Sequence, residues 1–208
     1  ARLAGLVHEK TRGNAFFVRQ FLKSLYEEGL LYFNDDTRQW EGNIEAIYQQ
    51  GFTDNVVELM LQKVQKLPAV TVDKLQLAAC VGSRFDMETL LSLSEKKQSK
   101  TSIIEDLLPA IADGLIIPTS VYFYIDASTD ASKETVYQFA HEHVRKAGYS
   151  LLGEERKEEL HCKIGTLLLN KSQKTTPELL QKNKAISEQI FEIVKHLNRG
   201  KKFIKNQE

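Results

Sequence analysis

The 208-residue sequence has little of several features that would assign it to a protein class at once. Its 28 basic and 28 acidic residues cancel, so the strongly basic surface of a typical nucleic-acid-binding protein is missing in aggregate. No apolar run approaches the ~18 residues that span a bilayer, and the first residues lack the pattern of a signal peptide. Its two cysteines, Cys80 and Cys162, each stand within a helical pattern, and we interpret both as reduced packing residues of a cytoplasmic protein.

The motifs of common catalytic and metal sites are also missing. No glycine-rich loop ends in Lys-Ser or Lys-Thr, so the chain has no P-loop to hold a triphosphate. It has no Cys-x-x-Cys, no His-Glu-x-x-His and no serine in a nucleophile elbow. His141 and His143 are two residues apart, which on a helix directs them about 200° apart, a poor metal pair. We therefore expect no catalytic residue, no metal and no enzyme activity in this chain.

Helical and strand patterns organise the beginning of the chain. Residues 1–30 predict two helices that break at Gly13 and Asn14, because a flexible glycine and a good N-cap precede apolar residues at helical spacing. Gly29 predicts the end of the second helix. Two aromatic-rich runs on either side of the turn letters NDD then predict a short β-hairpin.

From residue 70 to 150 the pattern is three helices followed by a hairpin, which is the plan of a winged helix. The second helix is expected to begin at Asp86, and the letters GSRF before it are interpreted as a turn. The third is expected to end at Gly114 and to be interrupted at Pro109. After the run LIIP, the runs VYFYID and TVYQFA on either side of the polar loop ASTDASKE predict the hairpin. After residue 141 the pattern is helical to the end.

A winged helix raises the question of DNA binding, because the third helix of such folds normally enters the major groove. Residues 101–140 contain six acidic residues and one basic residue, Lys133. The helix that would read the groove carries Glu105, Asp106 and Asp113, which repel phosphates. We therefore expect a protein-contact or switch module, with neither nucleic acid nor a membrane as a partner.

Five segments follow one another in a fixed order over nearly the whole chain: GLVHEKTRGNAFFVRQFLKSLYEEGLL, FTDNVVELMLQKVQKLP, LQLAACVGSRFDMETL, YQFAHEHVRKAGYSLL and HLNRG. Together they resemble the predicted-ATPase segment of large multi-domain kinases of bacteria, best known in cyanobacteria. These proteins belong to the signal-transduction ATPases with numerous domains (STAND). In their usual order a Ser/Thr kinase domain leads, and the ATPase, helical repeats, a GAF sensor and often a histidine kinase follow.

The resemblance implies a fold class that is mainly α with small β-hairpins, in three parts. Residues 1–54 would be a helical lid with a short hairpin, the C-terminal part of the ATPase module, and residues 55–150 would be the winged helix. Residues 151–208 would be helices that lead into a TPR-like helical array. The P-loop and the magnesium-binding acid would lie upstream, since the chain opens on a helix already under way and is expected to be a piece of a longer protein.

The resemblance also implies two nucleotide-binding positions. Family members usually read Gly-Asn-Pro-Phe, and the matching Gly13, Asn14, Ala15 and Phe16 would line the adenine, although Ala15 lacks the proline ring. A Met-His-Asp-like motif, whose histidine contacts the β-phosphate of ADP, matches the run Ala140-His141-Glu142. From the residues alone, the alternatives are an N-capped amphipathic helix at the first position and a structural helix-start histidine at the second.

We therefore expect a regulatory half-module that binds ATP or ADP together with an upstream P-loop domain and couples nucleotide state to kinase output or oligomerisation. Its expected partners are that upstream domain and the downstream helical repeats of the same protein, and it is a candidate for self-association. The parent would be a protein kinase with an ATPase-like module. Two alternatives stay open: an interaction scaffold with a degenerate ATPase and, less favoured, a winged-helix transcription regulator.

Overall fold

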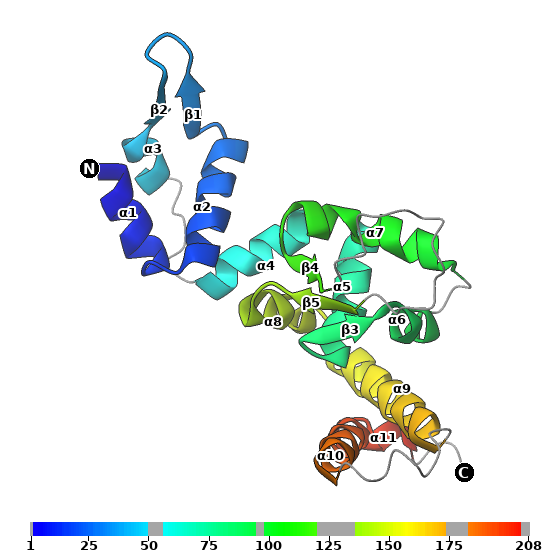
Figure 1. Ribbon diagram of the computed structural model, residues 1–208. Helices are drawn as coiled ribbons and strands as arrows, with labels where there is room; N and C mark the ends of the chain where they lie inside the picture. The colour runs from blue at the N-terminus through cyan, green and yellow to red at the C-terminus, as the bar shows by residue number, and fades with distance from the viewer. Residues whose placement is uncertain (1, 50–55, 95–97, 120–135, 174–182, 205–208) are drawn as a thin grey trace. The chain divides into compact units, whose positions relative to one another are not determined.

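The protein is mainly helical with two small antiparallel sheets in the computed structural model (Figure 1). The structure describes residues 2–49, 56–94, 98–119, 136–173 and 183–204. The chain divides into two compact units, residues 1–66 and 67–208, and each is described by itself. The expected fold class, mainly α with small β-hairpins, is confirmed. The division into three domains stays a prediction.

The first unit contains helices α1 (Arg2–Thr11), α2 (Ala15–Glu27), α3 (Ile44–Gln49) and α4 (Val56–Lys66), and strands β1 (Leu31–Asn34) and β2 (Gln39–Gly42). The two strands form the expected antiparallel hairpin, in which Phe33 lies opposite Trp40. At the end of α2, Gly29 has a φ of +70°, and the amide of Leu30 donates to the carbonyl of Leu25 at 2.8 Å. The sequence therefore predicts both this helix end and the hairpin correctly.

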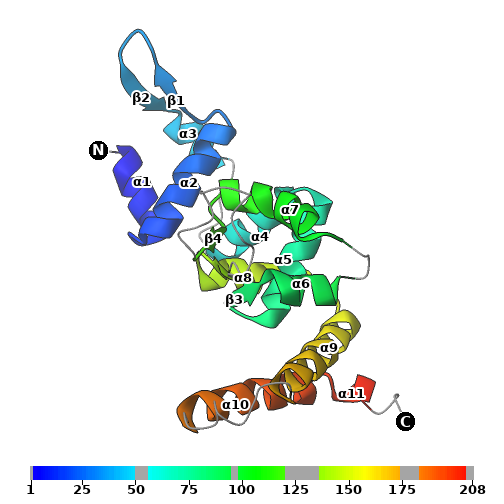
Figure 2. The same cartoon turned by 45° about the vertical axis from the view of Figure 1, so that its right-hand side comes forward.

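Helices α1 and α2 lie side by side and form the core of the first unit (Figures 1 and 2). Phe17, Phe21 and Leu25 of α2 are at most 5% exposed, and they recur at four-residue steps along one face of the helix. Leu6 and Val7 of α1 are buried as well. The apolar spacing that predicts α2 is thus the spacing that packs it.

The second unit contains the remaining elements, namely α5 (Ala69–Val81), β3 (Arg84–Asp86), α6 (Met87–Leu93), α7 (Lys100–Ala112), β4 (Ile116–Pro118), β5 (Val136–Phe139), α8 (Glu142–Ser150), α9 (Glu154–Gln173), α10 (Asn183–Arg199) and α11 (Lys201–Ile204). Strand β5 lies between β3 and β4 and is antiparallel to both. Strand β5 corresponds to TVYQFA, the second strand of the expected hairpin, and it pairs with β4 from the run LIIP. The runs VYFYID and ASTDASKE lie outside the described residues.

Two local predictions for this unit are wrong. Arg84 and Phe85, in the letters interpreted as a turn, belong to β3, because Phe85 pairs with Tyr137 of β5 and the two buried rings stack. Pro109 does not interrupt α7, which continues to Ala112. The proline stands in the last turn, where its missing amide removes one hydrogen bond, and its carbonyl still accepts from the amide of Asp113 at 3.0 Å.

The core of the second unit joins helices α5, α6, α7 and α8. Leu75, Leu90, Ile103, Leu107 and Val144 are all fully buried. Each helix contributes one or two of these residues, so the apolar faces of the four helices converge on a single core. The short sheet adds the buried rings of Phe85 and Tyr137.

Helices α9 and α10 pack closely because glycines stand at their contact. A Cβ built on Gly200, which follows α10, would lie 2.4 Å from the amide nitrogen of Cys162. A Cβ on Gly165 would lie 2.6 Å from Cδ2 of Leu197. Cys162 and Cys80 are both free and buried, which agrees with their interpretation as packing residues.

Candidate functional site

The turn between α1 and α2 carries the four residues expected to line a nucleotide base. Gly13 has a φ of +75°, a conformation that strains any residue with a Cβ, and Ala15 is the first residue of α2. Oδ1 of Asn14 accepts from the amides of Phe16 at 3.0 Å and of Phe17 at 3.3 Å. The structure thus brings Gly13, Asn14, Ala15 and Phe16 together at one helix start.

The capping bonds of Asn14 determine what this helix start can bind. A helix N-terminus attracts phosphates because its first amides have no partner within the helix. Here the amides of Phe16 and Phe17 already donate to Asn14, so a phosphate would have to displace that side chain. The turn is therefore better suited to contact with an uncharged, planar group than to phosphate binding.

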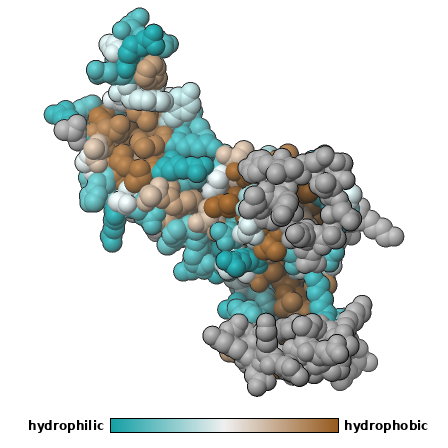
Figure 3. All heavy atoms as spheres, in the orientation of Figure 1, coloured by the Kyte–Doolittle hydropathy of each residue, from teal (hydrophilic) through white to brown (hydrophobic). Residues whose placement is uncertain are grey.

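An apolar pocket adjoins the turn within the first unit. It has a volume of about 390 Å³ and is lined by Leu3, Ala4, Val7, His8, Gly13, Val18 and Leu22 of α1, α2 and their connection. Figure 3 shows hydrophobic side chains, in brown, over this part of the unit. The pocket's size and apolar lining suit a planar ring system, because ligand sites are concave and mostly apolar.

His141 belongs to the second unit, where it is the N-cap of α8. Its ring nitrogen Nδ1 accepts from the backbone amide of His143 at 3.2 Å. Partial burial lowers the pKa of His141, and nearby His143 lowers it further, whereas Glu142 opposes the shift. The ring is therefore neutral at pH 7, and with Nδ1 accepting, its proton is on Nε2.

The two histidines at this helix start meet, contrary to the expectation from their spacing. Nδ1 of His143 lies 3.0 Å from Nδ1 of His141, and the ring centroids are 4.9 Å apart. The prediction that they point about 200° apart is wrong because His141 has an extended backbone, with φ −154° and ψ 149°, and is not within the helix. Since Nδ1 of His141 is an acceptor, His143 carries its proton on Nδ1.

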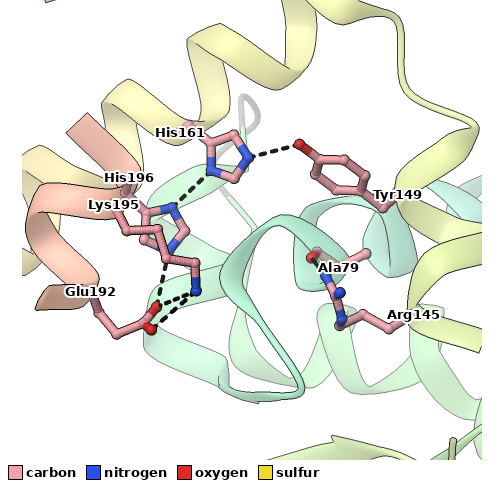
Figure 4. A network of polar contacts seen from close by, with 7 residues as sticks. All are labelled: Ala79, Arg145, Tyr149, His161, Glu192, Lys195 and His196. Atoms are coloured by element: carbon pink, nitrogen blue, oxygen red, sulfur yellow. Dashed lines mark hydrogen bonds and ion pairs between the residues drawn. The ribbon is translucent and has the colours of Figure 1, made fainter. Parts of the chain in front are cut away.

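Arg145, one turn into α8, is held by two neighbours. Its Nε donates to Oε2 of Glu142 at 2.8 Å. Its NH1 group donates to the carbonyl of Ala79 in α5 at 3.2 Å, as Figure 4 shows. The carbonyl of Ala79 lies near the end of α5, where a cation is favourable. This arginine therefore ties α8 to α5, and the sequence does not reveal that role.

A chain of polar side chains, also missed by sequence reasoning, connects helices α8, α9 and α10 of the second unit (Figure 4). The hydroxyl of Tyr149 in α8 lies 3.0 Å from Nε2 of His161 in α9. Nδ1 of His161 lies 2.8 Å from Nδ1 of His196 in α10, and both histidines are 2% exposed. His196 has a further hydrogen bond to the backbone of Val81 in α5. This bond raises the pKa of His196 and so opposes the effect of burial.

The two ends of this chain determine where every proton lies. Nε2 of His196 lies 3.9 Å from Oε2 of Glu192, an oxygen that can only accept, so we expect His196 to carry its proton on Nε2 and to accept at Nδ1. His161 must then donate from Nδ1 and accept at Nε2, and the hydroxyl of Tyr149 is its donor. Burial is the main cause that lowers the pKa of each histidine to about 4, so both are neutral at pH 7.

Sequence patterns offer a weak signal for this chain. His161 stands three residues before the buried Ile164, and His196 stands three residues after the buried Ile193, so each shares the buried face of its helix. A buried polar side chain requires a partner, so such positions indicate an undetected contact. The partner of His161 is 35 residues away, however, and nothing in one sequence identifies it.

Metal binding and membrane insertion find no support in the described residues. Within the ranges that the structure describes, no group of three or more His, Cys, Asp or Glu side chains is arranged to hold a metal ion. In that same part of the chain, every helix is too short or too polar to cross a bilayer.

Two known proteins are similar to this chain, and both are histidine kinases. "Hybrid signal transduction histidine kinase G" of Dictyostelium discoideum is 31% identical over an alignment of 194 residues, which covers 81% of this chain and 6% of that protein. "Peroxide stress-activated histidine kinase mak3" of Schizosaccharomyces pombe is 24% identical over 209 residues, covering 99% of this chain and 8% of that protein. No family model matches the chain, and no solved structure matches it.

The chain is thus similar, at low identity, to a segment of signalling histidine kinases, and it spans less than a tenth of the length of either relative. This agrees with the signalling-kinase context that the sequence resemblance implies. The STAND-type ATPase assignment and the bacterial origin stay predictions.

Proposed function

We propose that this chain is the regulatory C-terminal half of an ATP- or ADP-binding module of the STAND type in a multi-domain signalling kinase. It couples nucleotide state to kinase output or oligomerisation and performs no chemistry itself. The observation that carries the proposal is its similarity to segments of two histidine kinases, which covers 81% and 99% of the chain. Such a segment, far smaller than either kinase, is suited to regulate a catalytic domain elsewhere in the protein.

The order of elements in the second unit supports the winged-helix part of the proposal. Helices α5, α6 and α7 contribute to one core. The chain order is α5-β3-α6-α7-β4-β5, and the three strands form one antiparallel sheet in the order β3-β5-β4. In winged helices, three helices and a small sheet follow one another in this way. Helix α7 carries Glu105 and Asp106, and its Lys100 is paired with Glu88 at 3.5 Å, so its charges disfavour a DNA-binding function.

The two predicted nucleotide-binding positions belong to different units, and we propose a role for each by itself. Gly13 lines an apolar pocket, and Gly13, Ala15 and Phe16 of the same turn would contact the base, while Asn14 shapes the turn by capping α2. His141 would donate from Nε2 to a phosphate oxygen, since Nδ1 is already an acceptor within α8. A neutral imidazole whose proton is held on Nε2 presents one N–H group to a phosphate oxygen, which suits a sensor of bound phosphate.

The peroxide response in the name of the fission-yeast relative is not expected to act through Cys80. Burial raises the pKa of this thiol to about 12, so the reactive thiolate is scarce at pH 7. Peroxide reacts with thiolates that are both ionised and accessible. We therefore propose that Cys80 serves packing in this module.

The first test of the proposed function is the affinity of the parent protein for ADP, wild type against His141→Ala, by calorimetry. Loss of a charge-assisted hydrogen bond, worth about 1.5–3 kcal/mol, lowers the affinity roughly ten- to hundredfold. Equal affinities would contradict the sensor role. Absence of ADP binding by either protein would support the alternative, an interaction scaffold.

The scaffold alternative has one observation in its favour. Ala15 lacks the proline ring that the family resemblance implies, and the amides at the start of α2 are occupied by Asn14. The sequence upstream in the parent protein would distinguish a nucleotide-binding module from an interaction scaffold. An intact Gly-x-x-x-x-Gly-Lys-Ser/Thr motif supports nucleotide binding, and a broken one supports the scaffold.

A further inference from the structure

The hairpin of the first unit exposes a cluster of three aromatic rings. Tyr26 is 59% exposed, Trp40 is 58% exposed and Phe33 is 41% exposed. The centroid of the Trp40 ring lies 5.9 Å from that of Tyr26 and 5.6 Å from that of Phe33, both in edge-to-face contact. We call Tyr26, Phe33 and Trp40 the aromatic patch.

The aromatic patch is organised but does not belong to the core. Phe33 and Trp40 are directly opposite each other across β1 and β2, and Tyr26 reaches them from α2. Leu31, two residues before Phe33 on the same face of β1, is buried, as is the preceding Leu30, so this segment joins the core only at the start of the strand. Three contacting aromatic rings that remain this exposed are typical of an interaction surface.

The charges around the aromatic patch are predominantly negative. Residues 31–42 contain Asp35, Asp36 and Glu41 against the single basic residue Arg38, a net charge of −2. Among the bonds that the described residues make, none involves the carboxylates of Asp35 or Asp36. The turn that carries Asp35 and Asp36 begins two residues after Phe33, roughly 7 Å along the strand. This distance is within one screening length at physiological salt, so salt does not fully screen these carboxylates from a cation at the aromatic patch.

Glu41 remains ionised, and the other nearby carboxylates are already paired. Hydrogen bonds from Thr37 and Asn34, both at 2.9 Å, lower the pKa of Glu41. By contrast, Glu27 and Glu28 at the end of α2 are neutralised by lysines of α4 and do not add to the negative field. The uncompensated charge is therefore concentrated on the hairpin itself.

We propose that the aromatic patch is a docking surface for a basic protein segment, with arginine or lysine side chains that lie against its rings and near the carboxylates of the hairpin. Cations are attracted to aromatic faces, and arginine stacks on them as well. Nucleic acids and anionic membranes carry the wrong charge for this hairpin. The surface is distinct from the proposed nucleotide-binding positions, so it goes beyond the proposed function.

Trp40 is the one tryptophan of the chain, so its fluorescence reports directly on the aromatic patch. The 208-residue protein is titrated with a twelve-residue peptide of alternating arginine and serine, and in parallel with a peptide of alternating glutamate and serine. We expect a saturable change of Trp40 emission with the arginine peptide alone. Its affinity should fall about threefold or more between ~50 and ~300 mM NaCl, because screening weakens the attraction.

Two variants separate specific docking from general charge attraction. The double change Asp35→Asn and Asp36→Asn lies in an exposed turn and should weaken binding about threefold. Trp40→Leu, followed by calorimetry, should weaken it about fivefold or more, while the control Phe191→Leu, at a 69% exposed residue of α10, should leave it unchanged. Circular dichroism establishes that each variant is folded.

Three results would overturn the proposal. The first is equal binding of both peptides, and the second is an affinity for the arginine peptide that survives Trp40→Leu together with the double aspartate change. The third is a Trp40 emission that changes with protein concentration in the absence of peptide, which would identify a second copy of the chain as the occupant.

Discussion

The second unit contains two histidine pairs with nearly the same internal geometry and very different surroundings. In each pair the Nδ1 atoms face each other, at 3.0 Å for His141 and His143 and 2.8 Å for His161 and His196, and in both the ring centroids are 4.9 Å apart. The first pair is half-buried at a helix start, whereas the second is 2% exposed between helices. Geometry alone therefore does not distinguish a binding histidine from a structural one.

What distinguishes the pairs is their burial and what each holds in place. The buried pair is flanked by the hydroxyl of Tyr149 on one side and by the backbone of Val81 and the carboxylate of Glu192 on the other, so it joins four helices. At the helix start, His141 uses Nδ1 to cap α8 and carries its proton on the opposite nitrogen. We infer that the buried pair serves stability and that His141 is the candidate for ligand contact.

The largest effect is expected from breaking the helix contact that buries the second pair. Gly200→Ala places a Cβ 2.4 Å from a backbone nitrogen of Cys162, an atom that cannot move away alone. Overpacking of this kind costs about 3 kcal/mol or more of unfolding free energy, measured by urea unfolding. Gly165→Ala meets the flexible side chain of Leu197 and should cost less, so an equal cost for the two variants would contradict this account.

The buried pair also predicts a pH dependence of stability. The pKa of His161 and of His196 is about 4 in the folded protein against about 6.5 unfolded, so the unfolded chain binds more protons between these values. The stabilisation is complete above pH 6.5 and is lost as the pH falls toward 4. Between pH 7.5 and 5.5 the free energy of unfolding should fall by about 2–3 kcal/mol.

His196→Gln provides the matched test of that dependence. Glutamine keeps an amide that can donate and accept but does not titrate, so about half of the decrease between pH 7.5 and 5.5 should disappear. A wild-type stability that stays constant over this interval would show that the buried histidines do not remain neutral.

A smaller effect is expected at the end of the buried chain. Tyr149→Phe removes the donor to His161 and leaves an acceptor nitrogen unpaired, at a cost of about 1–2 kcal/mol. Nitrogen NMR of the ring should show the proton on Nδ1 in His161 and on Nε2 in His196. A proton on Nε2 of His161 would show that His161 does not accept from Tyr149, whatever the stability of the variant.

The sequence predicts helix ends and turns well because they depend on neighbouring residues. Asn14, Asp86 and Gly29 act within four positions along the chain, and each does in the structure what its residue type favours. Strand β3 was missed because three residues form it only by pairing with β5, some 50 positions later. The contact between His141 and His143 was missed because a helix cap lacks helical geometry.

The candidate site is only partly predictable for the same reason. Asn14 and His141 are recognisable as helix-start residues, and the apolar pocket beside Gly13 follows from α1 and α2 packing. The buried chain from Tyr149 to Val81 requires four helices to converge, and no local pattern encodes that. Contacts between residues far apart in the sequence, which local residue preferences do not encode, therefore limit what can be predicted from this sequence.

The most direct test of the central claim compares two replacements of His141 in the parent protein. Alanine removes both the cap and the ring, whereas asparagine is a good N-cap but lacks the donor at the Nε2 position. If His141 contacts a phosphate, calorimetry will show ADP affinity reduced about ten- to hundredfold in both variants. If His141→Asn binds ADP as tightly as the wild type, the histidine is only a helix cap and the sensor role is wrong.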